Sequence, residues 1–461
     1  MRANRLGVFF LIGVVIAFTA APTSADDKPN IIFVLSDDVG LGNISCYNGQ
    51  FKTPNIDALA TSGTRFEHCY ANPLCGPSRA TCLTGRYVFR TGMLTNGAAS
   101  VAAMDPKKEI MLPNVLKPAG YVTAHTGKWS QLPLQPGDWG FDEYLRFAGS
   151  GKYWASQDEK YTLNGQQKAL GDKYLPDVMH EFVVDFMTRH KDRPFYIHYA
   201  MSHMHNQMLR TPDSKPESKN KKDFYPDNNA YMDKLVGQLV GAIDKLGLRE
   251  KTLIVFTGDN GTAGNSAKAK VDGRELSGAK GSMLEGGSRV PLIVNWKGVT
   301  PAGKVLKDLT DFTDFLPTFA EVAGAKLPEG VKIDGKSFAP QVKGQAGQPR
   351  EWVYVQLGSD RYVRNERWKL TGDGALFDLK EAPFNEIPVA ANTDDAEAKA
   401  GRTKLVAVLD GLKAEDTGAP APKKKKKKNK LNPTPEAAKT PAQPPVQLDI
   451  PPREVADPSG K

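Results

Sequence analysis

The sequence predicts an α/β fold with a mostly parallel central sheet, followed by a small antiparallel subdomain at the C-terminal end. Three observations support this prediction. Short apolar, β-branched runs alternate with segments that begin and end like helices. The first apolar run ends in a pair of aspartates, as a buried parallel strand does when it delivers ligands at its carboxyl end. Short aromatic strands begin near Arg350.

The expected elements of the main domain follow in chain order. Residues 30–35 form the first buried strand, and a helix starts within residues 53–60, where a proline follows a threonine. Further buried strands are expected at residues 195–200, 253–257 and 290–295. A helix over residues 311–323 is expected to stop at Gly324. Strands at residues 352–355 and 361–364 then begin the antiparallel subdomain.

The chain is long enough for more than one folded part, because single cores stop growing at about 250–300 residues. The expected segments are a signal peptide at 1–25, the main domain at 26–345, the small C-terminal subdomain at 346–413, and a disordered tail at 414–461. Arg2 and Arg5 precede an apolar run, and residues 23–25 are small, as at a cleavage site. An uncleaved membrane anchor is the alternative. We expect an exported protein, either periplasmic or secreted.

The C-terminal tail is rich in lysine and proline, and residues 423–428 are all lysine. It is too polar to bury a core, so it is expected to be disordered. The tail and the N-terminal segment account for most of the net charge of +9. A nucleic-acid role does not suit an exported chain, so none is predicted. The tail is either a solvated linker or a contact with anionic glycans or the cell envelope.

Two groups of polar residues follow predicted strands. Asp37 and Asp38 end the first strand, and Asp259, Asn260 and Gly261 end a later one. The second group alone is typical of a turn. Together, hard oxygen atoms at two strand ends are the ligands that Ca²⁺ or Mg²⁺ takes. The sequence therefore predicts a metal site at the carboxyl edge of the sheet.

The most informative run is CGPSRATCLTGR, from Cys75 to Arg86. It carries Cys, Pro, Ser, Arg, Leu, Thr, Gly and Arg at the offsets that resemble the signature of formylglycine-dependent sulfatases. The resemblance to type I sulfatases of the alkaline-phosphatase superfamily covers most of residues 29–380. It implies a three-layer sandwich. Besides the run, it is carried by residues 29–47, 53–57, 90–93, 127–129, 259–261 and 278–291.

The resemblance implies that a formylglycine-generating enzyme oxidises Cys75 to formylglycine during maturation. One hydroxyl of the hydrated aldehyde attacks sulfur, and the other later collapses to the carbonyl and expels sulfate. The alternative is that Cys75 stays a buried, inert thiol. The implied activity is hydrolysis of a sulfated glycan or an aryl sulfate. Cys69 and Cys82 flank the run and are candidates for a disulfide, which spacing alone does not decide.

The resemblance also implies a metal-ligand set. Asp37, Asp38, Asp259 and Asn260 are expected to hold one Ca²⁺ per chain, with residue 75 in its formylglycine form as a further oxygen ligand.

Three cationic residues match the family at catalytic positions. Arg79 is expected to hold the formylglycine hydrate in place. Lys128 and Lys280 are expected to bind sulfate oxygens and to stabilise charge growing on the ester oxygen. Each lysine taken alone would be expected at the solvated surface.

The sequence departs from the family at two histidines. Ser130 stands where the family has a histidine that takes a proton from the hydrate, and a serine is a poor base near neutral pH. The second histidine is usually followed by one residue and proline. Counting from the strand at 195–200 places His205 there, as a sulfate ligand or an acid for the leaving group, without the proline. His203 and His125 are further candidates to offset Ser130, although His125 also fits a core position.

Three alternatives to a sulfatase stay open. A phosphonate or phosphate monoester hydrolase could use the same fold and nucleophile, because the tetrahedral oxyanion is similar. A noncatalytic protein that binds sulfated glycans would explain Ser130. A scaffold attached to the cell envelope would depend on the lysine-rich tail.

Overall fold

The computed structural model describes residues 28–416. The expected signal peptide at 1–25 and nearly all of the expected tail at 414–461 lie outside these residues. Contacts group the described residues into one unit. Within this part of the chain, no helix has the length and apolar character needed to cross a bilayer.

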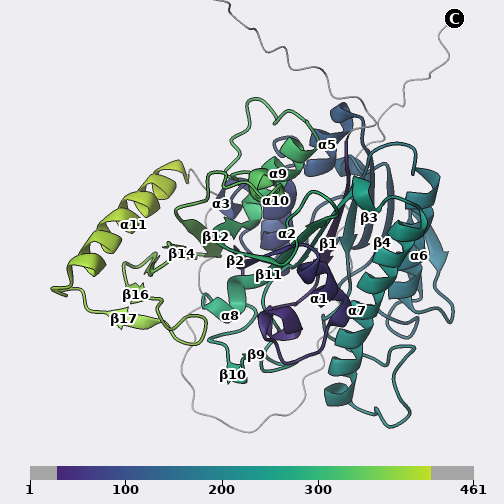
Figure 1. The fold of residues 1–461 in the computed structure, drawn as a ribbon, viewed down its shortest axis with the longest axis horizontal. Coiled ribbons are helices and arrows are strands. Elements are labelled where there is room, and N and C mark those ends of the chain that lie inside the picture. The colour runs from purple at the N-terminus through teal and green to yellow at the C-terminus, as the bar shows by residue number, and fades with distance from the viewer. Residues whose placement is uncertain (1–27, 417–461) are drawn as a thin grey trace, which may run out of the picture. The chain divides into compact units, whose positions relative to one another are not determined.

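The main sheet is built from strands that come from most of the chain. Its strands are β1 (Asn30–Ser36), β2 (Thr64–Tyr70), β3 (Val122–Lys128), β4 (Glu143–Phe147), β5 (Lys160–Leu163), β6 (Gln166–Ala169), β7 (Phe195–Ala200), β8 (Thr252–Gly258), β11 (Arg289–Trp296) and β12 (Lys304–Asp311). In the described chain these ten strands form one sheet in the order β12-β2-β11-β8-β1-β7-β3-β4-β5-β6 (Figure 1).

The centre of this sheet is parallel. β8, β1, β7, β3 and β4 run in the same direction. β12 is parallel to β2, whereas β11 is antiparallel to both of its neighbours and β5 and β6 are antiparallel at the other edge. The carboxyl ends of the five central strands therefore share one edge, which is where ligands gather in such sheets.

Helices cover both faces of the sheet. The α-helices are α1 (Pro54–Thr61), α2 (Cys75–Thr84), α3 (Val88–Thr91), α4 (Ala98–Ala103), α5 (Leu112–Leu116), α6 (Leu175–Arg189), α7 (Lys221–Lys245), α8 (Glu285–Ser288), α9 (Phe315–Val322), α10 (Ala339–Val342) and α11 (Ala396–Glu415). A two-stranded ribbon, β9 (Lys270–Val271) and β10 (Arg274–Glu275), lies outside the main sheet.

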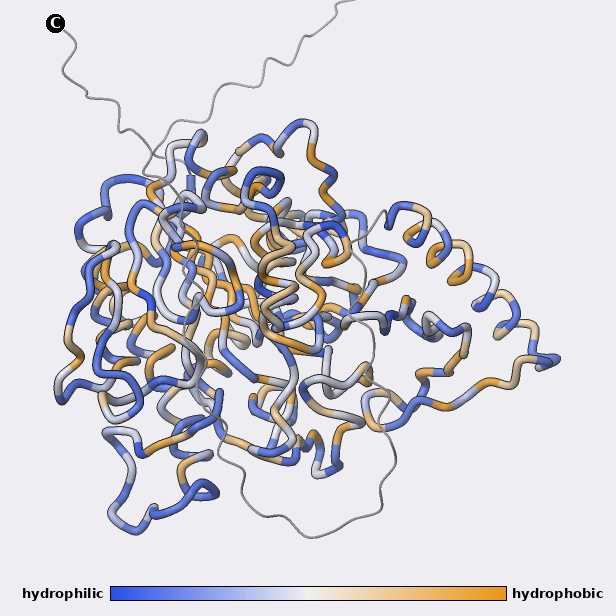
Figure 2. Tube along the Cα trace, turned by 180° about the vertical axis from the view of Figure 1, so that it is seen from behind, coloured by the Kyte–Doolittle hydropathy of each residue, from blue (hydrophilic) through white to orange (hydrophobic). Residues whose placement is uncertain are grey.

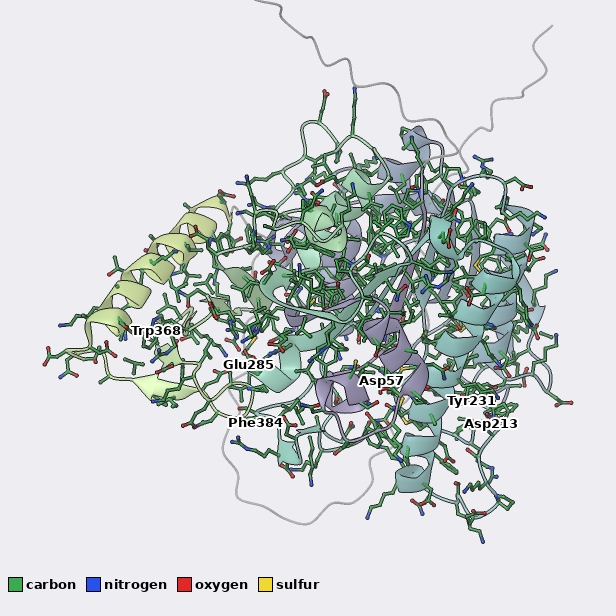
Figure 3. The ribbon with its side chains drawn as sticks, viewed as in Figure 1. Asp57, Asp213, Tyr231, Glu285, Trp368 and Phe384 are labelled. Atoms are coloured by element: carbon green, nitrogen blue, oxygen red, sulfur yellow. The ribbon has the colours of Figure 1, made fainter. Side chains whose placement is uncertain are left out.

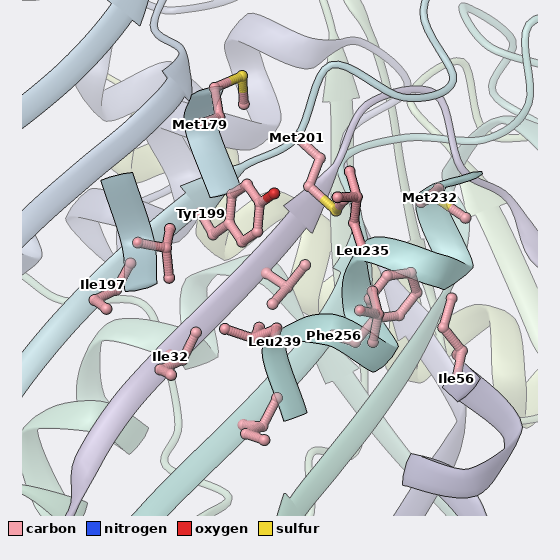
Figure 4. Packing of buried hydrophobic residues seen from close by; sticks show 14 of the residues in the cluster. Ile32, Ile56, Met179, Ile197, Tyr199, Met201, Met232, Leu235, Leu239 and Phe256 are labelled. Carbon is pink, nitrogen blue, oxygen red and sulfur yellow. The ribbon is translucent and has the colours of Figure 1, made fainter. Parts of the chain in front are cut away.

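The side chains of β1 alternate between two apolar cores. Ile32 and Val34 pack with residues of α1, α6 and α7, and Figure 4 shows part of this cluster. Ile31, Phe33 and Leu35 pack on the other face with residues of α2, α5, α9 and α10. Successive side chains of a strand point to opposite faces, so a fully apolar strand requires cover on both. The result is a three-layer sandwich, with hydrophobic segments concentrated in its interior (Figure 2).

The C-terminal part forms a second sheet of five antiparallel strands within the described chain. These are β13 (Val353–Leu357), β14 (Asp360–Arg364), β15 (Trp368–Thr371), β16 (Leu376–Asp378) and β17 (Ile387–Val389). Leu405 and Leu409 of α11 pack with Trp368 and Leu370 of β15 in a small separate core.

A buried ion pair and a hydrogen bond join the second sheet to the main domain. Glu285 of α8 bonds Arg364 of β14 at 2.9 Å, and Figure 3 places Glu285 on the side of the main domain nearer Trp368. The Lys369 ammonium lies 2.7 Å from a carboxylate oxygen of Glu386 and donates to the carbonyl of Met283 at 2.6 Å. The loop that precedes α8 is therefore held by the C-terminal sheet.

The predicted strands agree with the structure to within one or two residues at each end, and the predicted fold class is confirmed. The predicted helix at 311–323 begins too early. β12 continues to Asp311, a 3₁₀ turn covers Phe312–Asp314, and α9 starts at Phe315. The Asp311 carboxylate accepts from the Thr313 N–H, so this residue caps the turn instead of starting the helix.

Two further features were not specified by the sequence. Helix α11 was not predicted and continues to Glu415, into the first residues of the expected tail. All four cysteines, Cys46, Cys69, Cys75 and Cys82, are free in the structure, so the Cys69–Cys82 pairing that the spacing left open is not formed.

Candidate active site

Four polar side chains converge at the carboxyl ends of β1 and β8. Asp37 and Asp38 follow β1, and Asp259 and Asn260 follow β8, its parallel neighbour. The backbone N–H of Asp38 donates to Asp259 Oδ1 at 3.0 Å, which ties the two strand ends together. All four residues are buried. Adjacent parallel strands thus bring together residues that lie more than 200 positions apart in sequence.

Cys75 is the first residue of α2 and faces this cluster. Its Sγ lies 3.5 Å from Asp37 Oδ1 and 3.9 Å from Asp38 Oδ1. The sulfur and one oxygen from each of Asp37, Asp38 and Asp259 all lie within 4.8 Å of one another. Burial, reinforced by the charge of Asp259, raises the pKa of the Cys75 thiol to about 12. The unmodified side chain is therefore a protonated thiol near neutral pH.

Two lysines bond directly to the aspartates. Lys128 is the last residue of β3, and its Nζ lies 2.7 Å from Asp37 Oδ2. Lys280 comes from the loop before α8, and its Nζ lies 2.5 Å from Asp38 Oδ1. Gly127 allows β3 to reach this depth, because a β-carbon there would lie 1.9 Å from the carbonyl oxygen of Ala200 on β7.

Arg79 supplies the third cation, one helical turn after Cys75 on α2. Its Nη2 and Nε donate to Asp259 Oδ2 at 2.7 and 3.1 Å, and its Nη1 donates to the carbonyl of Lys128 at 3.3 Å. The side chains of Arg79 and Asp259 are both 0% exposed. This contact holds α2 and its first residue against the end of β8.

The pKa values of the Asp37 and Asp259 carboxylates shift in opposite directions. Burial alone would raise the pKa of Asp37, but Lys128, His205 and Arg79 hold it below its usual range. Burial and the neighbouring Asp37 raise the pKa of Asp259 above its usual range, despite Arg79. The pKa of Asp37 is lowered because several cationic groups surround it, whereas Asp259 has two neighbouring carboxylates, Asp37 and Asp38, that add to the effect of burial.

The donor set fits a hard divalent cation. Asn260 donates its amide N–H groups to Asp38 Oδ1 at 2.8 Å and to the Gly261 carbonyl at 2.9 Å. Among the described residues its Oδ1 is buried and has no hydrogen-bond partner. A buried amide oxygen next to three carboxylates is a typical ligand arrangement for Ca²⁺ or Mg²⁺.

The structure separates the two histidines of the 203–205 segment. His205 is half-buried and lies close enough to Asp37 to lower its pKa. The His203 ring points instead to Tyr174, with its Nε2 3.1 Å from the tyrosine hydroxyl, and burial lowers its pKa to about 3. His203 serves the site through its backbone, because its carbonyl accepts from the Asp37 N–H at 2.6 Å.

Ser130 and His125 have other partners. The Ser130 hydroxyl donates to the carbonyl of Gly149 and lies 3.3 Å from the Ser150 hydroxyl. His125 Nδ1 lies 3.2 Å from His198 Nδ1 in the buried core, where burial lowers the pKa of His125 to about 3. The structure thus does not bring the His125 ring to the aspartates, and it leaves the Ser130 hydroxyl bound to a loop.

Sequence reasoning missed several residues around Cys75. Asn96 Oδ1 accepts from the backbone N–H of Gly76 at 2.9 Å. Gln131 packs on the same glycine, because a β-carbon at Gly76 would lie 2.9 Å from Gln131 Cβ. Thr262 accepts from the backbone N–H of Lys280 at 3.0 Å. The sequence offered a signal where these residues adjoin a motif, with Gln131 beside Ser130 and Thr262 directly after Gly261.

The fold and these residues agree with the chain's similarities to known proteins. The sulfatase family model matches residues 29–325, and the model of the N-sulphoglucosamine sulphohydrolase C-terminal region matches residues 279–385. Steryl-sulfatase of Rattus norvegicus is 28% identical over 433 residues, which cover 74% of this chain and 74% of that protein. N-acetylgalactosamine-6-sulfatase of Canis lupus familiaris is 31% identical over 366 residues, with 72% and 70% covered.

Solved structures give the same result. The crystal structure of Ps i-CgsB in complex with k-i-k-neocarrahexaose matches with a TM-score of 0.72 and 28% identity, and covers 85% of this chain and 93% of that one. The family match covers residues 29–325, which include every strand of the main sheet. The protein therefore belongs to the sulfatase family, the type I sulfatases of the alkaline-phosphatase superfamily, and is a sulfatase.

Proposed function

We propose that this enzyme releases sulfate from sulfated carbohydrates or aryl sulfates, with residue 75 in its formylglycine form and one bound Ca²⁺. The observation that carries the proposal is the position of Cys75 Sγ, 3.5 Å from Asp37 in a buried group of three carboxylates and three cations. A thiol with a pKa of about 12 is a poor nucleophile. Conversion to an aldehyde hydrate supplies a nucleophile that also has a way to expel sulfate.

Asp37, Asp38, Asp259 and Asn260 would hold the calcium, with an oxygen of the converted residue 75 as a further ligand. When bound, the ion supplies positive charge that polarises a sulfate oxygen and aligns the ester. The unpartnered Oδ1 of Asn260 supports this assignment, because metal coordination would satisfy it.

The cationic residues have separate roles in this proposal. Lys128 and Lys280 now bond to Asp37 and Asp38, and they would turn to the sulfate oxygens once the carboxylates face a metal. Preorganised cations in a buried site stabilise developing negative charge strongly. Arg79 stays on Asp259 and holds residue 75 in place. His205 donates a proton to the departing alcohol or phenol.

Ser130 indicates which step of the reaction should be slow. The family histidine at this position accepts a proton as sulfate leaves, and the Ser130 hydroxyl is instead bound to the carbonyl of Gly149. A serine hydroxyl is a poor general base at neutral pH. We therefore propose that release of sulfate is slower than release of the alcohol.

The biological setting follows from the same proposal. Residues 1–25 would direct export to the periplasm or outside the cell, and a formylglycine-generating enzyme would oxidise Cys75 during maturation. The main domain would span 26–345, the C-terminal subdomain 346–413 and the lysine-rich tail 414–461, with the tail as either a solvated linker or a contact with anionic glycans or the envelope. N-acetylgalactosamine-6-sulfatase and the neocarrahexaose complex of Ps i-CgsB support a sulfated glycan as the substrate class.

The test combines mass spectrometry with kinetics. Peptide mass spectrometry of the exported protein should find the Cys75 peptide about 18 Da lighter than its thiol form, the difference between thiol and aldehyde. The same preparation should hydrolyse 4-nitrophenyl sulfate and lose activity after calcium removal. An unmodified thiol, from a host that oxidises other sulfatases, would refute the proposal and favour a binding protein. Preference for a phosphate monoester would favour the phosphoryl hydrolase.

A further inference from the structure

Asn43 links the two loops that carry the proposed calcium ligands. It is the last residue of a short 3₁₀ turn in the loop after β1. Its Oδ1 accepts from the backbone N–H of Gly40 at 3.3 Å and from the hydroxyl of Thr262 at 2.7 Å. Gly40 comes two residues after Asp38, and Thr262 comes two residues after Asn260. One amide oxygen therefore bonds to both loops.

The amide nitrogen of Asn43 is bonded to α7. Its Nδ2 donates to the Tyr225 hydroxyl and to Asn229 Oδ1, each at 2.9 Å, and Asn229 Nδ2 donates back to the Asn43 carbonyl at 3.1 Å. Tyr225 and Asn229 lie one helical turn apart, so they share a face of α7. All three side chains are buried. The Asn43 amide thus makes the four hydrogen bonds that its two donors and two lone pairs allow, and it cannot turn without breaking them.

The same two loops are also in close backbone contact. A β-carbon at Gly40 would lie 2.9 Å from the backbone nitrogen of Thr262, and one at Gly258 would lie 1.9 Å from the carbonyl oxygen of Val39. Glycine at both positions permits this approach. The Thr262 carbonyl in turn accepts from the Lys280 N–H at 3.0 Å. The position of Thr262 therefore also affects a lysine of the site.

The ligand loops need such ties because their charges oppose each other. Asp37, Asp38 and Asp259 each place an oxygen within 4.8 Å of the others, and like charges this close repel. The Asp38 N–H bond to Asp259 joins the loops at the ligands, and Asn43 joins them a second time beyond the ligands. A site already held in its bound geometry loses less freedom when the ion binds, which raises its affinity.

We propose that Asn43 is a positioning residue for the calcium site, and that it raises the affinity for Ca²⁺ by holding the two ligand loops together through the hydroxyl of Thr262. It acts through these loops and is not itself a ligand. This inference rests on the proposed function, and it adds the residue that sets the spacing of the ligands.

The first experiment is calorimetric titration of Ca²⁺ into the full-length, formylglycine-containing protein. Asn43→Leu should bind Ca²⁺ about tenfold or more weakly than the native protein, which is the usual effect of losing a residue that orients metal ligands. Asn295→Leu is a matched control. Asn295 is also 0% exposed and donates to the Leu59 carbonyl and the Ser62 hydroxyl, each at 2.8 Å. It pairs with Ile254 near the amino end of β8, away from the site. This variant should lose stability in urea unfolding but keep native Ca²⁺ affinity.

A second pair of variants changes one hydroxyl. Thr262→Val removes the group that donates to Asn43 while nearly keeping the shape of the side chain, and Thr262→Ser retains it. Thr262→Val should weaken Ca²⁺ binding about fivefold, as expected for one hydrogen bond, and Thr262→Ser should stay near native. In Asn43→Leu, adding Thr262→Val should have little further effect, because the bond is already lost. If Asn43→Leu does not fold, the two Thr262 variants decide.

The outcomes separate this inference from the proposed function. Native affinity in Asn43→Leu or in Thr262→Val would overturn the inference alone. Equal losses in Thr262→Val and Thr262→Ser, or a loss in Asn295→Leu as large as that in Asn43→Leu, would do the same, because the effect would then not depend on the bond between the loops. A native protein that binds no Ca²⁺ would overturn the proposed function as well.

Discussion

Replacement of Lys369 by methionine should destabilise the protein far more than replacement of Lys369 and Glu386 together. The Lys369 Nζ lies 2.8 and 2.7 Å from the two oxygens of Glu386, and the side chains are 2% and 4% exposed. Lys369→Met alone leaves the Glu386 carboxylate buried without its cation. Breaking a buried pair in this way costs about 3–5 kcal/mol of unfolding free energy.

The double variant Lys369→Met with Glu386→Leu should lie within about 1 kcal/mol of the native protein, because it also removes the buried charge. The pKa shifts have the signs that this requires. Burial lowers the pKa of Lys369 and raises that of Glu386, so the fold disfavours the charged form of each group even with its partner present. The pair thus regains less by attraction than it loses in solvation.

Urea unfolding followed by tryptophan fluorescence would measure these differences, since Trp368 is the neighbour of Lys369 and is buried. The free energies and slopes of the native protein, Lys369→Met, Glu386→Leu and the double variant should be compared under the same calcium concentration, because a bound ligand adds to stability. A single variant that costs less than about 1 kcal/mol, or a double variant that costs the sum of both single variants, would refute the reasoning.

Four other outcomes are expected. Ser130→His should remove an initial burst of 4-nitrophenol and raise the steady rate about a hundredfold, as seen by stopped-flow absorbance; a native enzyme without a burst contradicts this. Asn260→Leu should weaken Ca²⁺ affinity about tenfold or more in calorimetric titration, and unchanged affinity would exclude it as a ligand. Lys128→Met should lower kcat about 10²–10³-fold while circular dichroism stays native, and a change in KM alone would place it in binding only. Although burial opposes it, Arg364 and its neighbours lower the pKa of Glu285 from 4.5 to about 2. The stability that the ionised Glu285 contributes is full above pH 4.5 and is lost as the pH falls toward 2. In urea titrations at several pH values, Glu285→Gln should therefore show a smaller loss of unfolding free energy on the acid side than the native protein. Equal losses in the two proteins would contradict this.

The strands and the order of layers could be predicted from the sequence, because a strand that is buried on both faces is apolar at nearly every position. The run at 30–35 is apolar at every position after Asn30, and β1 is buried throughout. The start of α9 was missed because Asp311 can continue a strand or cap a turn. Pairing of β12 with Tyr70 of β2 decides between the two, and that contact is not local.

The candidate site also has features that the sequence predicts and features that only distant contacts decide. Asp37, Asp259 and Cys75 were predicted as site residues because each stands in a motif, and the parallel pairing of β1 and β8 brings the first two together. Counting from the strand at 195–200 favours His205, but His203 lies only two residues away and stays a candidate on the sequence alone. The hydrogen bond of His203 to Tyr174, a residue 29 positions away, distinguishes the two.

Sequence by itself determined the class of fold, the family and the candidate site residues, because these depend on local patterns of burial and on motifs with fixed spacing. Tertiary structure alone decided the partners of each charge, the side on which each histidine lies, and the contact of Gln131 with Gly76. Those features arise where distant loops meet at a sheet edge. Their relative placement depends on packing of the whole domain, which no single segment encodes.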